Sequence, residues 1–260
     1  MGLPSAAYFD ASGKQEGYPF LTVAGAASPI KKWIRFELEW IQALKDEGVS
    51  EFHATDFAAS KGEYKDWKGD KPRRSAFVRF LTEIIKKNAN KLFLLTIETE
   101  TWNEVNREYL LEETFHSGYV LAGFSLAAQV LQWATRKRVQ LPFKIFSEDG
   151  DEGWTGLKQL CKKHLSFEPI RIPKNEGIPF QIGDFLAWKA RVTATNAKKI
   201  LDGLRRSDTM DELLRELDSL NRILAVSPHK NGVYTAKGLA ETCRNFKVPK
   251  PDIQASGTGS

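Results

Sequence analysis

Three groups of carboxylates in this 260-residue chain have the type and position needed for chemistry. Asp10 ends the apolar run Ala6–Asp10, which is typical of a β-strand. The loop Glu148–Glu152 follows another apolar run and holds four carboxylates in five residues, whose mutual repulsion a cation would relieve. Asp184 lies in a predicted helix, opposite that helix's apolar face. Such carboxylate oxygens are the ligands that Mg²⁺ or Mn²⁺ prefers.

Each of these groups also has a purely structural interpretation. Asp10 could cap the turn that Ser12 begins, because aspartate side chains accept hydrogen bonds from nearby backbone amides. The acidic loop could complement the dipole of a helix starting at Trp154. Asp184 could be an exposed acid paired with Arg191. For each group alone the structural interpretation is favoured, but their joint occurrence at strand, strand and helix positions strengthens the case for a site.

The elements that must position these residues alternate in a pattern typical of an α/β protein. Strands are predicted at Ala6–Asp10, Tyr18–Ala27, Lys91–Thr99, Pro142–Ser147 and Glu168–Pro173. Helices are predicted from an N-cap at Ser28 to Gly48, and at Arg73–Asn88, Phe115–Thr135, Trp154–His164, Phe180–Leu204 and Thr209–Leu224. Early hairpin-linked strands followed by strand–helix alternation predict a mixed five-stranded sheet flanked by helices, with the Asp10 strand central between its Tyr18–Ala27 and Pro142–Ser147 neighbours.

The domain organisation follows from the same pattern. We expect one α/β domain over residues 1–206, with a helical insertion at about residues 28–88 that forms a lid beside the sheet. A C-terminal helical extension is predicted at residues 207–247, and residues 248–260, rich in Pro, Gly and Ser, are expected to form a flexible tail. The charged stretch Lys61–Lys71 is expected to be a loop.

Composition limits the classes of function. No stretch approaches the ~20 apolar residues of a membrane span, and no secretory signal is recognisable, so we expect no membrane partner. Only two cysteines are present, which fits a reducing cytoplasm. The 38 basic residues against 33 acidic ones permit a nucleic-acid partner without requiring one. Of the tryptophans near basic clusters, Trp67, Trp133 and Trp154 could stack on bases, although core packing is favoured for Trp133.

Three segments together resemble the family catalogued as domain of unknown function 3800. They are Tyr8–Gly13, Phe52–Asp56 and Gln181–Ala187, in the order in which that family carries an Asp-Glu-Ser-Gly strand end, a His-Ala segment and a Gln-x-Ala-Asp-Leu-x-Ala helix. The resemblance spans about residues 8–188. It implies a ribonuclease-H-like fold of the retroviral integrase superfamily. The chain departs from the family pattern at Ala11, where Glu is usual, and at Gly183, where Ala is usual.

The resemblance also implies roles for particular residues. Asp10 matches the family's opening acid, and Asp184 matches the acid of its closing helix. Glu148 or Asp149 stands where ribonuclease-H-like enzymes place the acid that ends their fourth core strand. Residues expected at the edge of the site are Ser12, His53, Asp56 and Gln181.

The expected function is that of a divalent-metal-dependent nuclease, with Mg²⁺ or Mn²⁺ held by these acids and either DNA or RNA as the nucleic acid. The alternative is a catalytically degenerate ribonuclease-H-like binding or regulatory protein, which Ala11 favours because it removes a carboxylate beside Asp10. A weaker alternative is a hydrolase of another phosphate substrate. Because strand side chains alternate in direction, residue 11 need not face the partners of Asp10.

Overall fold

The core of the protein is one mixed β-sheet, shown in a computed structural model that describes residues 4–13, 17–139, 142–148, 153–173, 177–201 and 232–251. The strands are β1 (Ser5–Ser12), β2 (Phe20–Pro29), β3 (Lys91–Glu98), β4 (Phe143–Glu148), β5 (Ile170–Ile172) and β6 (Gly232–Tyr234). Their order across the sheet is β5-β4-β1-β2-β3-β6. β2 runs antiparallel to both β1 and β3, whereas the β1–β4, β4–β5 and β3–β6 pairs are parallel. Strand β1 therefore lies between an antiparallel neighbour, β2, and a parallel neighbour, β4.

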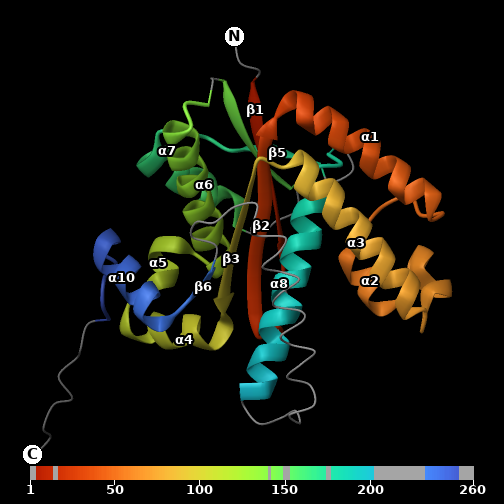
Figure 1. The fold of residues 1–260 in the computed structure, drawn as a ribbon. Coiled ribbons are helices and arrows are strands. Elements are labelled where there is room, and N and C mark those ends of the chain that lie inside the picture. The colour runs from red at the N-terminus through yellow and green to blue at the C-terminus, as the bar shows by residue number, and fades with distance from the viewer. Residues whose placement is uncertain are drawn as a thin grey trace, which may run out of the picture.

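Helices cover both faces of the sheet (Figure 1). One face carries α1 (Ile30–Asp46), α2 (Ala54–Ala59), the 3₁₀ helix η1 (Gly62–Trp67), α3 (Lys71–Asn88) and α8 (Phe180–Leu201). The other face carries α4 (Thr99–Glu108), α5 (Leu111–Phe115), α6 (Gly118–Arg136), α7 (Trp154–Leu165) and α10 (Ala236–Phe246). The first face is the one that matters for the acidic residues, because α8 lies directly against β1 and β2 there.

Side-chain alternation along β1 divides the interior into two hydrophobic cores. Ala6 and Tyr8 face α1 and α8, where aromatic rings dominate the core. Ala7 and Phe9 face α6 on the other side. Small residues in β2 let the helices of both faces approach the sheet closely, because alanine side chains add little depth. The central strand is consequently buried on both faces.

The predicted fold class is confirmed. All five predicted strands are present in a mixed sheet flanked by helices, and β1, which carries Asp10, lies between β2 and β4 as expected. The short strand β6 adds a sixth member at the β3 edge. The predicted insertion is helical and covers the α8 face of the sheet, since α1, α2, η1 and α3 all belong to it.

Several local predictions were wrong. Ser28 does not cap a helix: β2 continues through it, its hydroxyl donates to the Asn88 carbonyl oxygen at 2.6 Å, and α1 begins only at Ile30. The stretch predicted as a charged loop contains η1, which buries Tyr64 and Trp67 beneath its charged residues. The helical periodicity of Arg73–Asn88 predicts Phe77, Phe80 and Leu81 on the inner face, but Phe80 is 52% exposed. Trp67 packs in the first core at 2% exposure, which removes it as a base-stacking residue.

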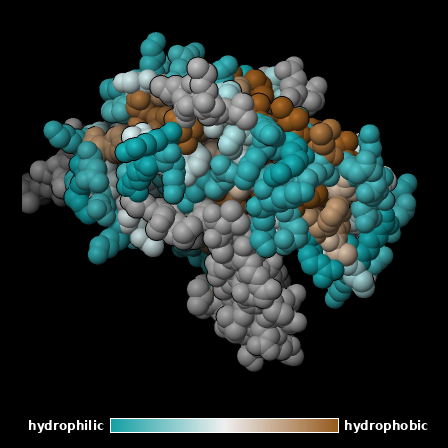
Figure 2. Space-filling view, turned by 45° about the horizontal axis from the view of Figure 1, so that its top comes forward, coloured by the Kyte–Doolittle hydropathy of each residue, from teal (hydrophilic) through white to brown (hydrophobic). Residues whose placement is uncertain are grey.

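The C-terminal region lies only partly within the described residues. The predicted helix Thr209–Leu224 falls outside them. Val248, assigned above to a tail, is buried in the second core, and Lys250 pairs with Glu108 at 3.2 Å. No helix in the described ranges is long and apolar enough to cross a membrane. Hydrophilic side chains cover most of the coloured surface in Figure 2, with a few hydrophobic patches between them.

Candidate functional site

The centre of the site is a pair of buried carboxylates at the ends of two parallel strands. The β1–β4 ladder pairs Phe9 with Ser147, and the next residues of the two strands are Asp10 and Glu148. Adjacent strands are ~4.8 Å apart, so the two acids are lateral neighbours. They share the α8 face of the sheet, because the residues two positions earlier stack there as Tyr8 on Phe146, with ring centroids 4.9 Å apart. Asp10 is 3% exposed and Glu148 is 7% exposed.

A glycine brings helix α8 into close contact with this pair. A Cβ added at Gly183 would lie 2.8 Å from both the Cβ and the backbone nitrogen of Asp10, and 3.0 Å from the carbonyl oxygen of Ala24. Only a residue without a side chain allows this approach. Asp184 is the next residue of the helix, so its backbone lies beside the strand end that carries Asp10.

The Asp184 side chain joins α8 to the helical insertion. Its Oδ2 accepts a hydrogen bond from the backbone N–H of Ala54 at 2.9 Å, which caps the first turn of α2. One turn earlier, the Oε1 of Gln181 accepts from the Phe52 backbone N–H at 2.9 Å and from the Trp40 indole at 2.7 Å. Asp184 is 8% exposed, so the interpretation of this residue as an exposed surface acid is wrong.

Two of the residues predicted at the edge of the site, His53 and Asp56, lie in this same junction. His53 Nδ1 is 3.1 Å from Asp56 Oδ2, and both side chains are 42% exposed. Burial raises the pKa of Tyr64, and nearby carboxylates that include Asp184 and Asp56 add to the rise. The segment from His53 to Asp56 therefore presents a half-exposed imidazole–carboxylate pair next to the buried Asp184.

Ser12 is the last residue of β1, and its side chain contacts the cationic side chain of Arg191. The guanidinium of Arg191 donates to the Ser12 hydroxyl at 2.9 Å and lies 4.4 Å from the centroid of the Tyr18 ring. Ser12 is two residues beyond Asp10 and therefore on the same face of the sheet. This places a positive charge at the end of β1, two residues beyond Asp10.

Tyr119 lies near the acidic pair on the opposite, α6 side of the sheet, and the sequence analysis did not single it out. Its hydroxyl lies 3.1 Å from the Ser147 hydroxyl. The pKa of Tyr119 is raised to about 12, chiefly by burial; the Ser147 hydrogen bond opposes the rise, and the negative charges of Asp10 and Glu148 contribute to it. A tyrosine at the start of a buried helix has no sequence signal that distinguishes it from an ordinary core residue.

The donor chemistry fits a divalent cation, although the described residues give an incomplete set of ligands. Asp10 and Glu148 supply hard oxygen atoms side by side, as Mg²⁺ or Mn²⁺ requires. Within the described ranges, no cluster of three or more His, Cys, Asp or Glu side chains is arranged to hold a metal ion. Asp149, the other candidate of the acidic loop, falls outside those ranges, so its role stays a prediction. Mg²⁺ commonly keeps several waters and takes only one or two protein carboxylates.

Ala11 does not change the set of side chains on the α8 face of the sheet, where Asp10 and Glu148 lie. Ala11 packs against the second core, on the α6 side of the sheet, with Phe9. A glutamate at this position, as in the family that the sequence resembles, would therefore point away from the face that carries Asp10. Alanine at residue 11 leaves the Asp10–Glu148 pair intact.

Comparisons with known proteins gave distant structural similarities. No family model matches the chain, and no curated protein matches it. Among solved structures, it is similar to the ribonuclease H2 from Pyrococcus horikoshii OT3, with 17% identity over 93% of this chain and 86% of that chain and a TM-score of 0.38. Two structures of Bst-RNase HIII, a point mutant and a complex with Mn²⁺, show 12% identity over 94% of this chain, with TM-scores of 0.43 and 0.44.

The chain spans 63% of Bst-RNase HIII, which is less than two thirds of its length. At TM-scores below 0.5 these similarities carry no weight for the site. The predicted mixed sheet with β1 at its centre rests on the strand order itself, in which β1 lies between β2 and β4 and runs parallel to β4.

Proposed function

We propose that this protein is a divalent-metal-dependent nuclease that hydrolyses phosphodiester bonds in DNA or RNA. The observation that carries the proposal is the Asp10–Glu148 pair, two buried carboxylates side by side at the C-terminal ends of adjacent parallel strands. Two such charges repel each other in a low-dielectric interior, and a bound cation relieves that repulsion. Ligands of open α/β sheets usually bind at this end of the strands.

The residues around the Asp10–Glu148 pair would have different roles in phosphodiester hydrolysis. Asp10 and Glu148 would hold the metal, with Asp149 and Asp184 as the further candidate ligands. Bound there, Mg²⁺ or Mn²⁺ would supply an activated water and charge stabilisation for the leaving oxygen. Arg191, held on Ser12 at the end of β1, would neutralise a substrate phosphate.

The His53–Asp56 pair stands at the insertion side of this centre, in the segment that Asp184 caps. Its partial exposure leaves the imidazole accessible to a substrate. We assign it to substrate positioning or proton transfer at the edge of the site, because a histidine paired with a carboxylate is suited to either role near neutral pH.

Mn²⁺ binding and cleavage can be tested together. At a free Mn²⁺ concentration ~100 times the Kd, mass action stabilises the fold by about 2.7 kcal/mol, which raises the Tm by roughly 5–10 °C. Asp10→Asn keeps the shape but removes the charge, so we expect it to abolish both the Mn²⁺-induced rise in Tm and the cleavage of single- and double-stranded DNA and RNA. Asp66→Asn, at an exposed acid of η1, is the matched control and should retain both.

A Tm that responds to Mn²⁺ equally in wild type and Asp10→Asn would show that the ion binds elsewhere. Cleavage that survives in Asp10→Asn would overturn the assignment of the site.

A second candidate is a catalytically degenerate binding protein with the same fold. The bond from the Ala54 N–H to Asp184 favours it, because it gives this carboxylate a structural role in holding the insertion. The Tm and cleavage measurements with Mn²⁺, together with oligonucleotide binding, separate the two candidates. A degenerate protein would bind oligonucleotides but show no Mn²⁺-dependent rise in Tm and no cleavage.

A further inference from the structure

A polar cavity lies at the same edge of the sheet as the acidic pair. At this edge the end of β1 pairs with the start of β2, where Ser12 is opposite Thr22. The start of β2 in turn pairs with the end of β3, where Phe20 is opposite Glu98. The cavity opens beside this last pair, between α4 and the C-terminal half of α8, and has a volume of ≈ 410 Å³. That volume is within the roughly 300–1,000 Å³ typical of small-molecule sites.

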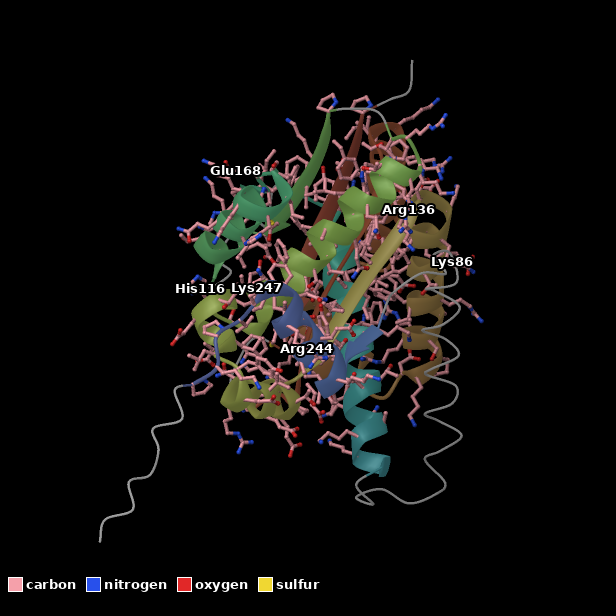
Figure 3. The ribbon with its side chains drawn as sticks, turned by 90° about the vertical axis from the view of Figure 1, so that its left-hand side faces the viewer. Lys86, His116, Arg136, Glu168, Arg244 and Lys247 are labelled. Carbon is pink, nitrogen blue, oxygen red and sulfur yellow. The ribbon has the colours of Figure 1, made fainter. Side chains whose placement is uncertain are left out.

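Helices α4 and α8 form two walls of this cavity. Figures 1 and 3 show α4 beside the C-terminal part of α8 at one end of the molecule. The charged, polar and aromatic side chains of the lining are Tyr18, Glu98, Glu100, Asn103, Arg107 and Lys198.

Arg191 connects the cavity to the end of β1. Its guanidinium donates to the hydroxyl of Ser12, two residues beyond Asp10, and lies over the ring of Tyr18. Lys198 follows two turns later on α8, which corresponds to about 10 Å at 1.5 Å per residue. A nucleic-acid strand bound at the acidic pair would therefore reach the cavity by passing Arg191.

The carboxylates of the cavity are held by a cation of its own lining. The Nζ of Lys198 lies 2.6 Å from Oε1 of Glu98 and 3.0 Å from Oε2 of Glu100. The hydrogen bond from Lys198 is the main cause that lowers the pKa of Glu98, so this ion cluster stays charged and paired. The two acids therefore present less negative charge to a ligand than their number suggests.

Arg107 is the second cation of the lining. Its Nε donates to the backbone oxygen of Asn103 at 3.3 Å, and it forms no ion pair with any carboxylate of the described ranges. The dipole of α4 favours a cation in this last turn, but it does not account for the cavity or for the aromatic ring on the cavity's other side. Asn103 lies one turn earlier on the same face of α4, and its amide can both donate and accept hydrogen bonds.

Tyr18 provides that aromatic ring, and its backbone is held in place. The hydroxyl of Thr99 donates to the Tyr18 carbonyl oxygen at 2.9 Å, and the Thr99 N–H donates to the Pro19 carbonyl oxygen at 2.9 Å. The guanidinium of Arg191 lies 4.4 Å from the ring centroid. Tyr18 is nevertheless 36% exposed, so part of the ring remains accessible to a planar group. Aromatic rings at such positions stack with bases of any identity.

We propose that this cavity binds one nucleotide of the nucleic-acid strand that is held at the acidic pair, at a position away from the cleaved bond. The base stacks on Tyr18, the Asn103 amide bonds to its edge, and Arg107 contacts a phosphate. Stacking and phosphate contacts carry little sequence information, so the subsite adds affinity for longer strands rather than sequence preference. The choice of ligand rests on the proposed function.

Competition binding of a single-stranded octanucleotide and a dinucleotide tests the contribution of Tyr18, in EDTA so that neither strand is cleaved. We expect Tyr18→Leu to weaken the octanucleotide about tenfold and to leave the dinucleotide unchanged, because only the longer strand reaches the cavity. Tyr18→Phe keeps the ring and should bind both as wild type does. A merely structural role of Tyr18 would affect both strands equally.

Salt dependence tests the contribution of Arg107. Losing one phosphate contact to a single strand lowers the slope of log Kd against log salt concentration by about 0.7, and we expect this change for Arg107→Gln with the octanucleotide. Arg107 is exposed, so the result stands even if Tyr18→Leu fails to fold. Arg79→Gln, at an exposed arginine of α3 that does not line the cavity, is the matched control and should keep the wild-type slope.

The subsite is overturned if either Tyr18→Leu or Arg107→Gln binds the octanucleotide as wild type does, or if wild type binds the octanucleotide no more tightly than the dinucleotide. Tighter binding of AMP than of the octanucleotide would also overturn it, because the cavity would then belong to a free nucleotide.

Cleavage with Mn²⁺ is measured separately, so the two proposals can fail independently. Octanucleotide binding that depends on Tyr18 and Arg107 without any cleavage would reject the nuclease and keep the subsite. Cleavage together with unaffected binding in both variants would keep the nuclease and reject the subsite.

Discussion

The close approach of α8 to β1 makes Gly183→Ala a sharp test of the structure. The added methyl group would meet the Cβ and nitrogen of Asp10 at 2.8 Å and the Ala24 carbonyl oxygen at 3.0 Å. These atoms belong to the two central strands and cannot rotate aside. The helix would have to retreat by about 0.6 Å, the difference between 2.8 Å and the 3.4 Å at which ordinary contact begins.

Two effects of this substitution oppose each other. Alanine is favoured over glycine in a helix by about 1 kcal/mol. Overpacking a rigid interior costs about 1–3 kcal/mol. Because all three neighbouring atoms are rigid, we expect the packing cost to win and the free energy of unfolding to fall by about 1–2 kcal/mol, which lowers the Tm by roughly 2–8 °C.

Urea unfolding and calorimetry of the variant measure this difference. Gly238→Ala is the matched control, since a Cβ there would meet Thr235 and Tyr234 at an ordinary 3.5 Å within the first turn of α10. We expect the control to be neutral or stabilising by up to about 1 kcal/mol. A Gly183→Ala protein at least as stable as wild type would refute the close packing of α8 on β1.

Further predictions concern single contacts. Tyr119 has a folded-state pKa of about 12 against 10.0 in the unfolded chain, so the stability held by its neutral form is complete below pH 10 and is lost as the pH rises toward 12. Tyr119→Phe should therefore reduce the alkaline loss of stability by about 2–3 kcal/mol in unfolding titrations, and an unchanged pH profile would contradict this. Gln181→Leu should lower the free energy of unfolding by about 2–4 kcal/mol, because it leaves the Trp40 and Phe52 donors buried without this acceptor; a loss below 1 kcal/mol would argue against those bonds. Asp70→Ala should cost about 1 kcal/mol in urea unfolding by removing the N-cap of α3, and no change would show that the cap is unimportant.

Local sequence patterns predicted an element correctly where one hydrophobic pattern continued along its whole length. The apolar run at β3 and the amphipathic pattern of α1 both predicted elements within about two residues of their observed bounds. The order of elements, a hairpin followed by strands that alternate with helices, also predicted the central place of β1, with the family resemblance as support.

Patterns failed where tertiary packing outweighed local preference. η1 reads as a charged loop because the two aromatic residues that it buries are only three positions apart among polar neighbours. α4 was missed because only Trp102 and Val105 of its ten residues are buried. Ser28 followed by proline has the pattern of a helix start, but pairing with Ala6 keeps that segment in β2.

The sequence by itself determined which residue types could form the site: an acid at the end of β1, an acid at the end of β4 and an acid in α8. It could not determine their mutual arrangement, because 138 residues separate Asp10 from Glu148 and the sheet register alone makes them neighbours. Only the tertiary structure showed that Asp184 caps the insertion, that Ala11 faces away from Asp10, and that Gly183 permits α8 to touch the strand. These are facts of direction and distance in space, and residue type and spacing along a chain do not encode them until strands and helices pack.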